Sequence, residues 1–169
     1  MGKQSVKPNK NIYFQCREKL GLTREEAEER LEGITASRIE KIENDRVAIH
    51  PEDVLIMADG YKSPELCNYY CSNECPIGKV HVPEVKIKDL SQIILELVVS
   101  LNGLQNKKDQ LMEITVDGRI ENDEVETFVR IQNELERMSM TVDALRLWSE
   151  QMLVNGKIDI DLFNKYRNQ

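Results

Sequence analysis

The stretch LTREEAEERLEGITASRIEKIENDR, residues 22–46, decides how the N-terminal part of the chain folds. Thr23 is followed three residues later by Glu26, which is the pattern of a capping box at the start of a helix. Gly33 interrupts the helical pattern after Leu31, and Thr35 is suited to cap a further helix over residues 36–43. The stretch therefore predicts two short helices joined by a tight turn.

The flanking residues predict two more short helices. One covers about residues 11–20 and is ended by Gly21, and the other covers residues 52–58, with Pro51 at its first position and Gly60 after it. Two short helices joined by a Gly-containing turn, inside a bundle of small helices, form the helix-turn-helix pattern. We expect this domain to span residues 1–63.

Composition limits the class of protein. The chain has 169 residues, 40% of them hydrophobic and only 5% aromatic, and its net charge is −7. This mix suits an all-α protein with an aliphatic core, and it excludes a disordered chain and a uniformly basic coat for nucleic acid. No apolar run reaches the roughly 18 residues of a membrane span, and no signal peptide precedes the first helix. We therefore expect no membrane partner and a reducing, cytoplasmic location.

The segments 22–27, 33–46 and 51–58 resemble the Cro/cI-type (xenobiotic-response-element, XRE) helix-turn-helix family of bacterial transcription regulators. The resemblance covers about residues 11–62, and its most specific points are the Ile42-Glu43-Asn44 triplet and the Cys16-Arg17 pair. It implies a lambda-repressor-like domain in which Arg17 and Glu43 form a structural ion pair. The sequence departs from the family where Glu32 and Gly33 replace a single Gly, and this extra residue leaves open whether the third helix is still aimed at DNA.

The same resemblance implies that the third helix lies in the major groove of double-stranded DNA. Arg38 would then donate to a guanine edge, Lys41 would lie beside it, and Arg24 and Arg46 would contact phosphates. The remaining candidate DNA-binding residues are small or hydroxylated: Thr35, Ala36 and Ser37.

Charge argues against this interpretation. Residues 1–63 hold 11 Lys and Arg residues against 12 Asp and Glu residues, and Glu40 lies among the reading positions. DNA-binding proteins gain much of their affinity at phosphates, so the cations must gather on one face. The alternative is a helical protein-interaction or scaffold protein whose helix-turn-helix does not read DNA.

Residues 64–86 form a Cys- and Pro-rich segment that we interpret as a linker. Cys67, Cys71 and Cys75 recur every four residues, and three thiolates with His81 could hold zinc or an iron–sulfur cluster. The spacing matches no zinc pattern, so we expect no cofactor, and the thiols then pack as small hydrophobes. A redox-active Cys71–Cys75 pair is a third alternative, which would make the protein a metal- or redox-responsive regulator.

Residues 87–169 read as a long helical hairpin followed by a short terminal helix. In the first run, apolar residues follow coiled-coil steps of four and three: Leu90, Ile94, Leu97, Leu101 and Leu104. A second run extends over about residues 123–153. A hairpin of this kind cannot bury two wide stripes within itself, so we predict a homodimer through residues 87–153 that forms a bundle. The alternative is that the stripes pack on the N-terminal domain of the same chain. The Cys-rich segment and this half together resemble a subgroup of the family found in Firmicutes-type bacteria.

The sequence contains no pattern that assembles an active site. Its two His residues, His50 and His81, lie in separate segments, and no Gly-rich phosphate loop, G-x-S-x-G or H-E-x-x-H motif occurs. We therefore expect no enzymatic activity. The sequence predicts a transcription regulator that binds specific DNA as a dimer.

Overall fold

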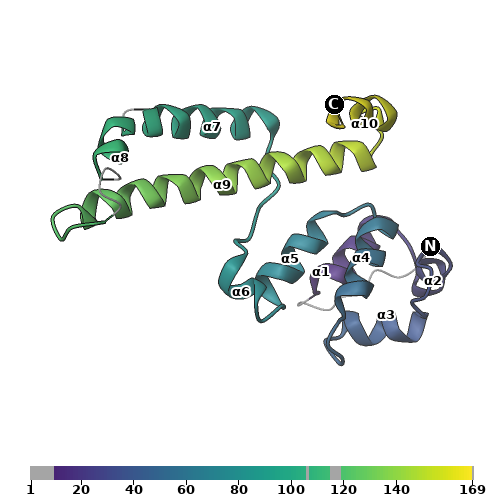
Figure 1. Cartoon of the computed structure of the whole chain (residues 1–169). Helices are drawn as coiled ribbons and strands as arrows, with labels where there is room; N and C mark the ends of the chain where they lie inside the picture. Colours follow the sequence, from purple (N-terminus) through teal and green to yellow (C-terminus); the bar gives the residue numbers. More distant parts are fainter. Residues whose placement is uncertain (1–9, 106, 115–118, 169) are drawn as a thin grey trace. The chain divides into compact units, whose positions relative to one another are not determined.

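The computed structural model describes residues 10–105, 107–114 and 119–168, and within these ranges every regular element is a helix (Figure 1). Contacts between residues divide the chain into two compact units. One unit comprises residues 1–84 together with 151–169, and the other comprises residues 85–150. No described helix is both long enough and apolar enough to cross a membrane.

Four helices begin the first unit: α1 (Ile12–Lys19), α2 (Arg24–Arg30), α3 (Ala36–Glu43) and α4 (Pro51–Gly60). Each of the first three starts at a polar cap, since the side chains of Asn11, Thr23 and Thr35 accept backbone N–H groups three residues further on. The capping box of Thr23 and Glu26 is present with both of its hydrogen bonds. Between α2 and α3, Gly33 adopts a φ of 95°, a conformation that favours glycine.

The core of this unit is aliphatic, with Tyr13 and Tyr61 as its large rings. Thirteen buried residues contact one another: Tyr13, Cys16, Ala27, Leu31, Ile34, Ile39, Ile42, Ile49, Val54, Met57, Ala58, Tyr61 and Leu66. Cys16 is 2% exposed and behaves as a small core residue.

The Cys-rich segment is not a bare linker. It forms α5 (Glu65–Asn73) and the four-residue α6 (Gly78–His81), and both belong to the first unit. Leu66 of α5 is fully buried in the core, with Tyr69 and Tyr70 packed against it. The first unit therefore extends about twenty residues beyond the domain expected from the sequence, because an apolar residue in α5 completes its core.

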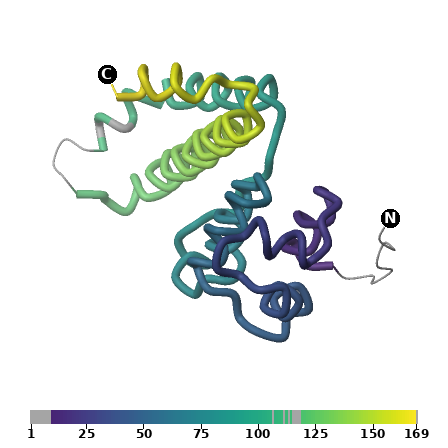
Figure 2. The backbone as a smooth tube through the Cα atoms, turned by 90° about the vertical axis from the view of Figure 1, so that its right-hand side faces the viewer, coloured from purple at the N-terminus to yellow at the C-terminus, as the bar shows by residue number. Residues whose placement is uncertain are grey.

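The C-terminal half consists of α7 (Leu90–Gln105), α8 (Lys108–Ile114), α9 (Val125–Val154) and α10 (Ile160–Arg167). Within the second unit α7 and α9 lie side by side and antiparallel (Figures 1 and 2). Their buried residues are Ile93 and Ser100 of α7, with Ile131, Thr141, Ala144 and Leu147 of α9. The sequence Val116-Asp117-Gly118-Arg119 also predicts a turn between the two long helical runs, and residues 116–118 of it lie outside the described residues.

The hairpin buries a different edge of the predicted stripe from the one that the heptad steps indicated. Leu90, Ile94 and Leu101 are 38%, 42% and 47% exposed, whereas Ile93 is fully buried. The buried residues Ile93 and Ser100 each precede a residue of the predicted stripe by one position. One position corresponds to about 100° around an α-helix, so the buried face is turned to one side of the predicted stripe. Within the second unit, an apolar stripe of α7 thus remains without a cover among the described residues.

Candidate nucleic-acid interface

Helix α3 presents one face to the core and another to solvent. Its buried residues are Ile39, Ile42 and Glu43. Thr35, Ser37 and Lys41 are exposed, and Ala36 and Arg38 are half-buried. All the DNA-contacting residues predicted on this helix therefore lie away from the core, at its first turn and one turn later.

Arg38 is held by a carboxylate that the sequence did not indicate. Its Nε donates to Oδ2 of Asp53 over 3.1 Å, and its Nη2 donates to the same oxygen. Burial by itself would raise the pKa of the Asp53 carboxyl, but the hydrogen bond from Arg38, the backbone N–H of His50 and the charge of Arg38 hold this pKa below its usual range. The residue predicted to read guanine thus joins α3 to the start of α4.

Arg17, Arg24 and Glu43 form a second cluster. The Glu43 carboxylate, fully buried, accepts from Nε of Arg17 at 2.5 Å and from Nη2 at 2.9 Å. Nε of Arg24 donates to the same carboxylate over 2.9 Å, and the Arg24 side chain is 32% exposed. The predicted structural pair is therefore part of a triad. Arg24, which the sequence predicted to contact a phosphate, donates its Nε–H to Glu43.

The other two predicted cations are less constrained. Lys41 is exposed and forms no ion pair with a described residue. Arg46 lies 3.5 Å from a carboxylate oxygen of Glu40, with both side chains largely exposed. A long ion pair in solvent contributes little, so Arg46 is available to another anion.

The N-terminus of α3 already has an anionic partner. The backbone N–H of Ala36 donates to a carboxylate oxygen of Glu28 over 2.9 Å. The partial positive charge at a helix N-terminus favours anions, and here a side chain of α2 supplies one. Glu28 and Asp53 are the two acidic partners at this surface that sequence reasoning missed. Both are eight or more positions from their partners, so no local spacing indicates them.

A comparison with protein families identifies this part of the chain. A family model described as a helix-turn-helix domain matches residues 15–66. Residues 15–66 form a helix-turn-helix domain. The matched range runs from the middle of α1 to Leu66 at the start of α5 and includes every predicted DNA-contacting residue. No curated protein matches the chain, and no solved structure does.

The Cys-rich segment brings no metal-binding cluster together in the described residues. No group of three or more His, Cys, Asp or Glu side chains there is placed to hold a metal ion. Cys67, Cys71 and Cys75 are half-buried thiols, and Sγ of Cys75 accepts from the backbone N–H of Gly78 over 3.4 Å. In this structure that sulfur satisfies a backbone donor at the start of α6.

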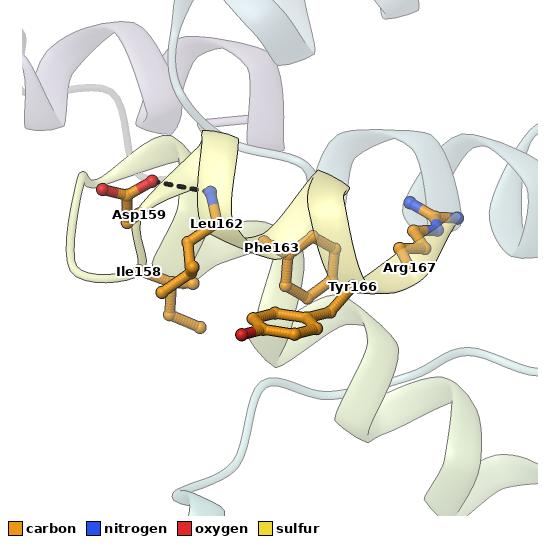
Figure 3. Close-up of a pocket in the computed structure, with 6 residues that line it drawn as sticks. All are labelled: Ile158, Asp159, Leu162, Phe163, Tyr166 and Arg167. Carbon is orange, nitrogen blue, oxygen red and sulfur yellow. Dashed lines mark hydrogen bonds between the residues drawn. The ribbon is translucent and has the colours of Figure 1, made fainter. Parts of the chain in front are cut away.

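A shallow cavity of about 480 Å³ lies along α10, far along the chain from the helix-turn-helix domain (Figure 3). It is lined by Ile158, Asp159, Leu162, Phe163, Tyr166 and Arg167. Asp159 uses its carboxylate to cap α10, accepting from the N–H of Leu162 over 2.8 Å. The other lining side chains are Ile158, Leu162, Phe163 and Tyr166, with Arg167 as the second charged residue.

Proposed function

We propose that the protein is a cytoplasmic bacterial transcription regulator of the Cro/cI (XRE) type, which binds specific double-stranded DNA as a dimer. The observation that carries this proposal is α3 itself. In a domain matched to the helix-turn-helix family, it turns Thr35, Ser37 and Lys41 to solvent while its apolar residues complete the core. In a helix-turn-helix the second of the two helices, here α3, enters the major groove, and the exposed polar side chains at its start reach the base edges.

The chemistry of these side chains fits a duplex. Hydroxyl groups of Thr35 and Ser37 can donate to bases or phosphates, and the ammonium group of Lys41 can donate to guanine or to a phosphate. Arg46 follows α3 and makes only a loose, exposed contact with Glu40, which supports its proposed contact with a phosphate. The acidic residues Glu28 and Asp53 are each occupied by a donor of the domain itself, which reduces their repulsion of phosphate.

The uncovered stripe of α7 supports the dimer. Leu90, Ile94, Val98 and Leu101 recur at steps of four and three and are all more than a third exposed. The only charged residue within α7 is Glu96, whose carboxylate is paired with Lys88 at 2.6 Å. A stripe without charges can meet an identical stripe across a two-fold axis without repulsion, so we assign a second copy of the chain as its partner.

Duplex binding as a function of salt tests the proposal. The full chain is used to select duplexes from a random pool, and affinity for the selected duplex is measured between about 50 and 200 mM salt. We expect Lys41→Ala to weaken binding and to reduce the slope of log affinity against log salt by about one. Lys79→Ala, which removes an exposed cation in α6, is the matched control and should leave both unchanged. If the wild-type chain selects no duplex in a salt-dependent way, the proposal is overturned.

The occupied cations favour a second candidate function. Arg24 and Arg38 are both paired with carboxylates, and Glu28 occupies the N-terminus of α3. A helix-turn-helix of this kind could serve as a protein-interaction surface. Recovery of the same partner protein by the wild-type chain and by Lys41→Ala, without duplex binding, would favour this alternative.

The third candidate is a metal- or redox-responsive regulator that acts through Cys67, Cys71 and Cys75. Anaerobic purification followed by elemental analysis tests whether the cysteines bind a metal, since a metal site would hold zinc or iron in a fixed ratio to protein. Thiol titration before and after mild oxidation decides the redox arm. A loss of two thiols that Cys71→Ser abolishes would support a Cys71–Cys75 pair.

A further inference from the structure

The contact between Arg38 and Asp53 leaves one edge of the guanidinium unused. A guanidinium has two hydrogen-bonding edges, one formed by Nε and one terminal nitrogen, the other by its two terminal nitrogens. Asp53 takes the Nε and Nη2 edge, and its Oδ2 accepts from both nitrogens. Nη1 makes no hydrogen bond with a described residue, and the Arg38 side chain is 32% exposed.

The unused edge has the donor pattern that guanine requires. In the major groove guanine presents the acceptors O6 and N7, which the two terminal nitrogens of an arginine bind together. Arg38 is the third residue of α3, in the first turn of the helix that such domains place in the groove. The edge that remains available is thus the edge that reads this base.

Asp53 is itself firmly placed. It lies in the first turn of α4, which begins with Pro51, and its Oδ2 also accepts from the backbone N–H of His50 over 3.3 Å. The following residues of α4, Val54 and Met57, are buried in the core. The Asp53 side chain is only 13% exposed. A carboxylate fixed on a packed helix can orient a flexible side chain on the neighbouring helix.

We propose that Asp53 is a positioning residue that orients Arg38 for bidentate recognition of a guanine in the bound duplex. This inference rests on the proposed DNA-binding function and adds the base that one side chain selects. An arginine fixed before binding loses less side-chain entropy when it meets the base, so discrimination increases.

If Asp53 acted only through its charge, removing its carboxylate would strengthen DNA binding. An acidic side chain near DNA repels phosphates, so its neutralisation tightens binding to every duplex, whatever the sequence. A positioning role predicts a loss confined to duplexes that carry the recognised guanine. The two roles are therefore separated by the ratio of affinities for two duplexes.

The test compares Asp53→Asn with Asp59→Asn. Asp59 is an exposed carboxylate of the same helix, paired with Lys62 at 3.2 Å, and its neutralisation changes the net charge equally. The probes are the duplex selected by the wild-type chain and a set in which each G·C pair is replaced in turn. We expect the wild-type chain to discriminate against loss of one guanine by roughly ten- to hundredfold. Asp53→Asn should lose most of that ratio, and Asp59→Asn should keep it.

Two further variants make the result specific. Arg38→Lys should lose the same discrimination, because an ammonium group cannot bind two acceptors in the guanidinium geometry. Arg38→Ala combined with Asp53→Asn should cost no more discrimination than either change alone, because the two residues act as one pair. Circular dichroism confirms that each variant is folded. An Asp53→Asn chain that retains the wild-type ratio, or binds all duplexes more tightly by the same factor, overturns the inference while leaving DNA binding intact. A wild-type chain that selects no duplex overturns both.

Discussion

Glu43 of α3 and Arg17 of α1 form a buried ion pair in which both carboxylate oxygens accept from the guanidinium, at 2.5 and 2.9 Å. Nη1 of Arg17 donates to the carbonyl oxygen of Leu22 over 2.6 Å, so the same side chain also fixes the connection that leads into α2. One arginine therefore links the helix before the helix-turn-helix to both of its helices.

Glu43→Gln should destabilise the first unit strongly. It leaves Arg17, 9% exposed, as a buried charge without a full partner, and breaking such a pair costs about 3–5 kcal/mol. Hydrogen exchange of the α1–α3 amides under increasing urea measures the loss. Glu40→Gln is the control, since the Glu40 pair with Arg46 is exposed, and it should change stability by less than about 0.5 kcal/mol. Equal effects of the two changes would contradict a special role for Glu43.

Asp53 should make the first unit sensitive to acid. Its pKa in the folded chain is lowered from the usual value of 3.8, so the unfolded chain takes up the proton first as the pH falls. The contribution of Asp53 to stability is thus fully present above that usual value and is lost as the pH falls through it towards the lowered one. Urea unfolding at several values between about pH 5 and 3 should show a shallower decline for Asp53→Asn than for the wild-type chain. A decline of the same slope would show that other carboxylates carry the acid response.

The sequence predicted the helix-turn-helix closely because its signals are local. Thr23 and Thr35 cap the helices at which they were expected to act, and α3 covers residues 36–43 as predicted. The partners of the cations could not be predicted in this way. Asp53 lies 15 residues from Arg38, and only the packing of α4 beside α3 brings the two together.

Helix α7 shows a different limit. Its residues are apolar around most of the circumference, since Leu95 and Val99 are 65% and 61% exposed in addition to the predicted stripe. Periodicity selects a buried face only when the other faces are polar. The heptad steps therefore predicted a helix and a wide apolar surface, but the edge that contacts α9 depended on the partner helix.

Gly78→Ala should disturb the packing of α6 on α5. A Cβ at Gly78 would lie 2.0 Å from the carbonyl oxygen of Cys71, and a backbone atom within a helix cannot move aside cheaply. We expect a loss of about 1–3 kcal/mol and faster reaction of the Cys71 and Cys75 thiols with a disulfide reagent. Val80→Ala changes a residue of α6 that is 76% exposed and should leave both measurements unchanged. Unaltered thiol reactivity in Gly78→Ala would show that this close approach is not required.

The self-association proposed for α7 makes a prediction about mass. Ile94→Asp with Leu101→Asp places two charges on the uncovered stripe, where they would be buried at a two-fold interface without a partner. Light scattering after size exclusion should give twice 19.6 kDa for the wild-type chain and 19.6 kDa for this variant. Affinity for a two-site duplex should fall by a factor of about 100 or more, since linked sites gain that much from effective concentration. Val99→Asp adds a charge to α7 at a position that is 61% exposed and lies on the side of the helix away from the stripe, and it should remain dimeric. A monomeric wild-type chain, or a dimer that tolerates both charges, would remove α7 as the interface.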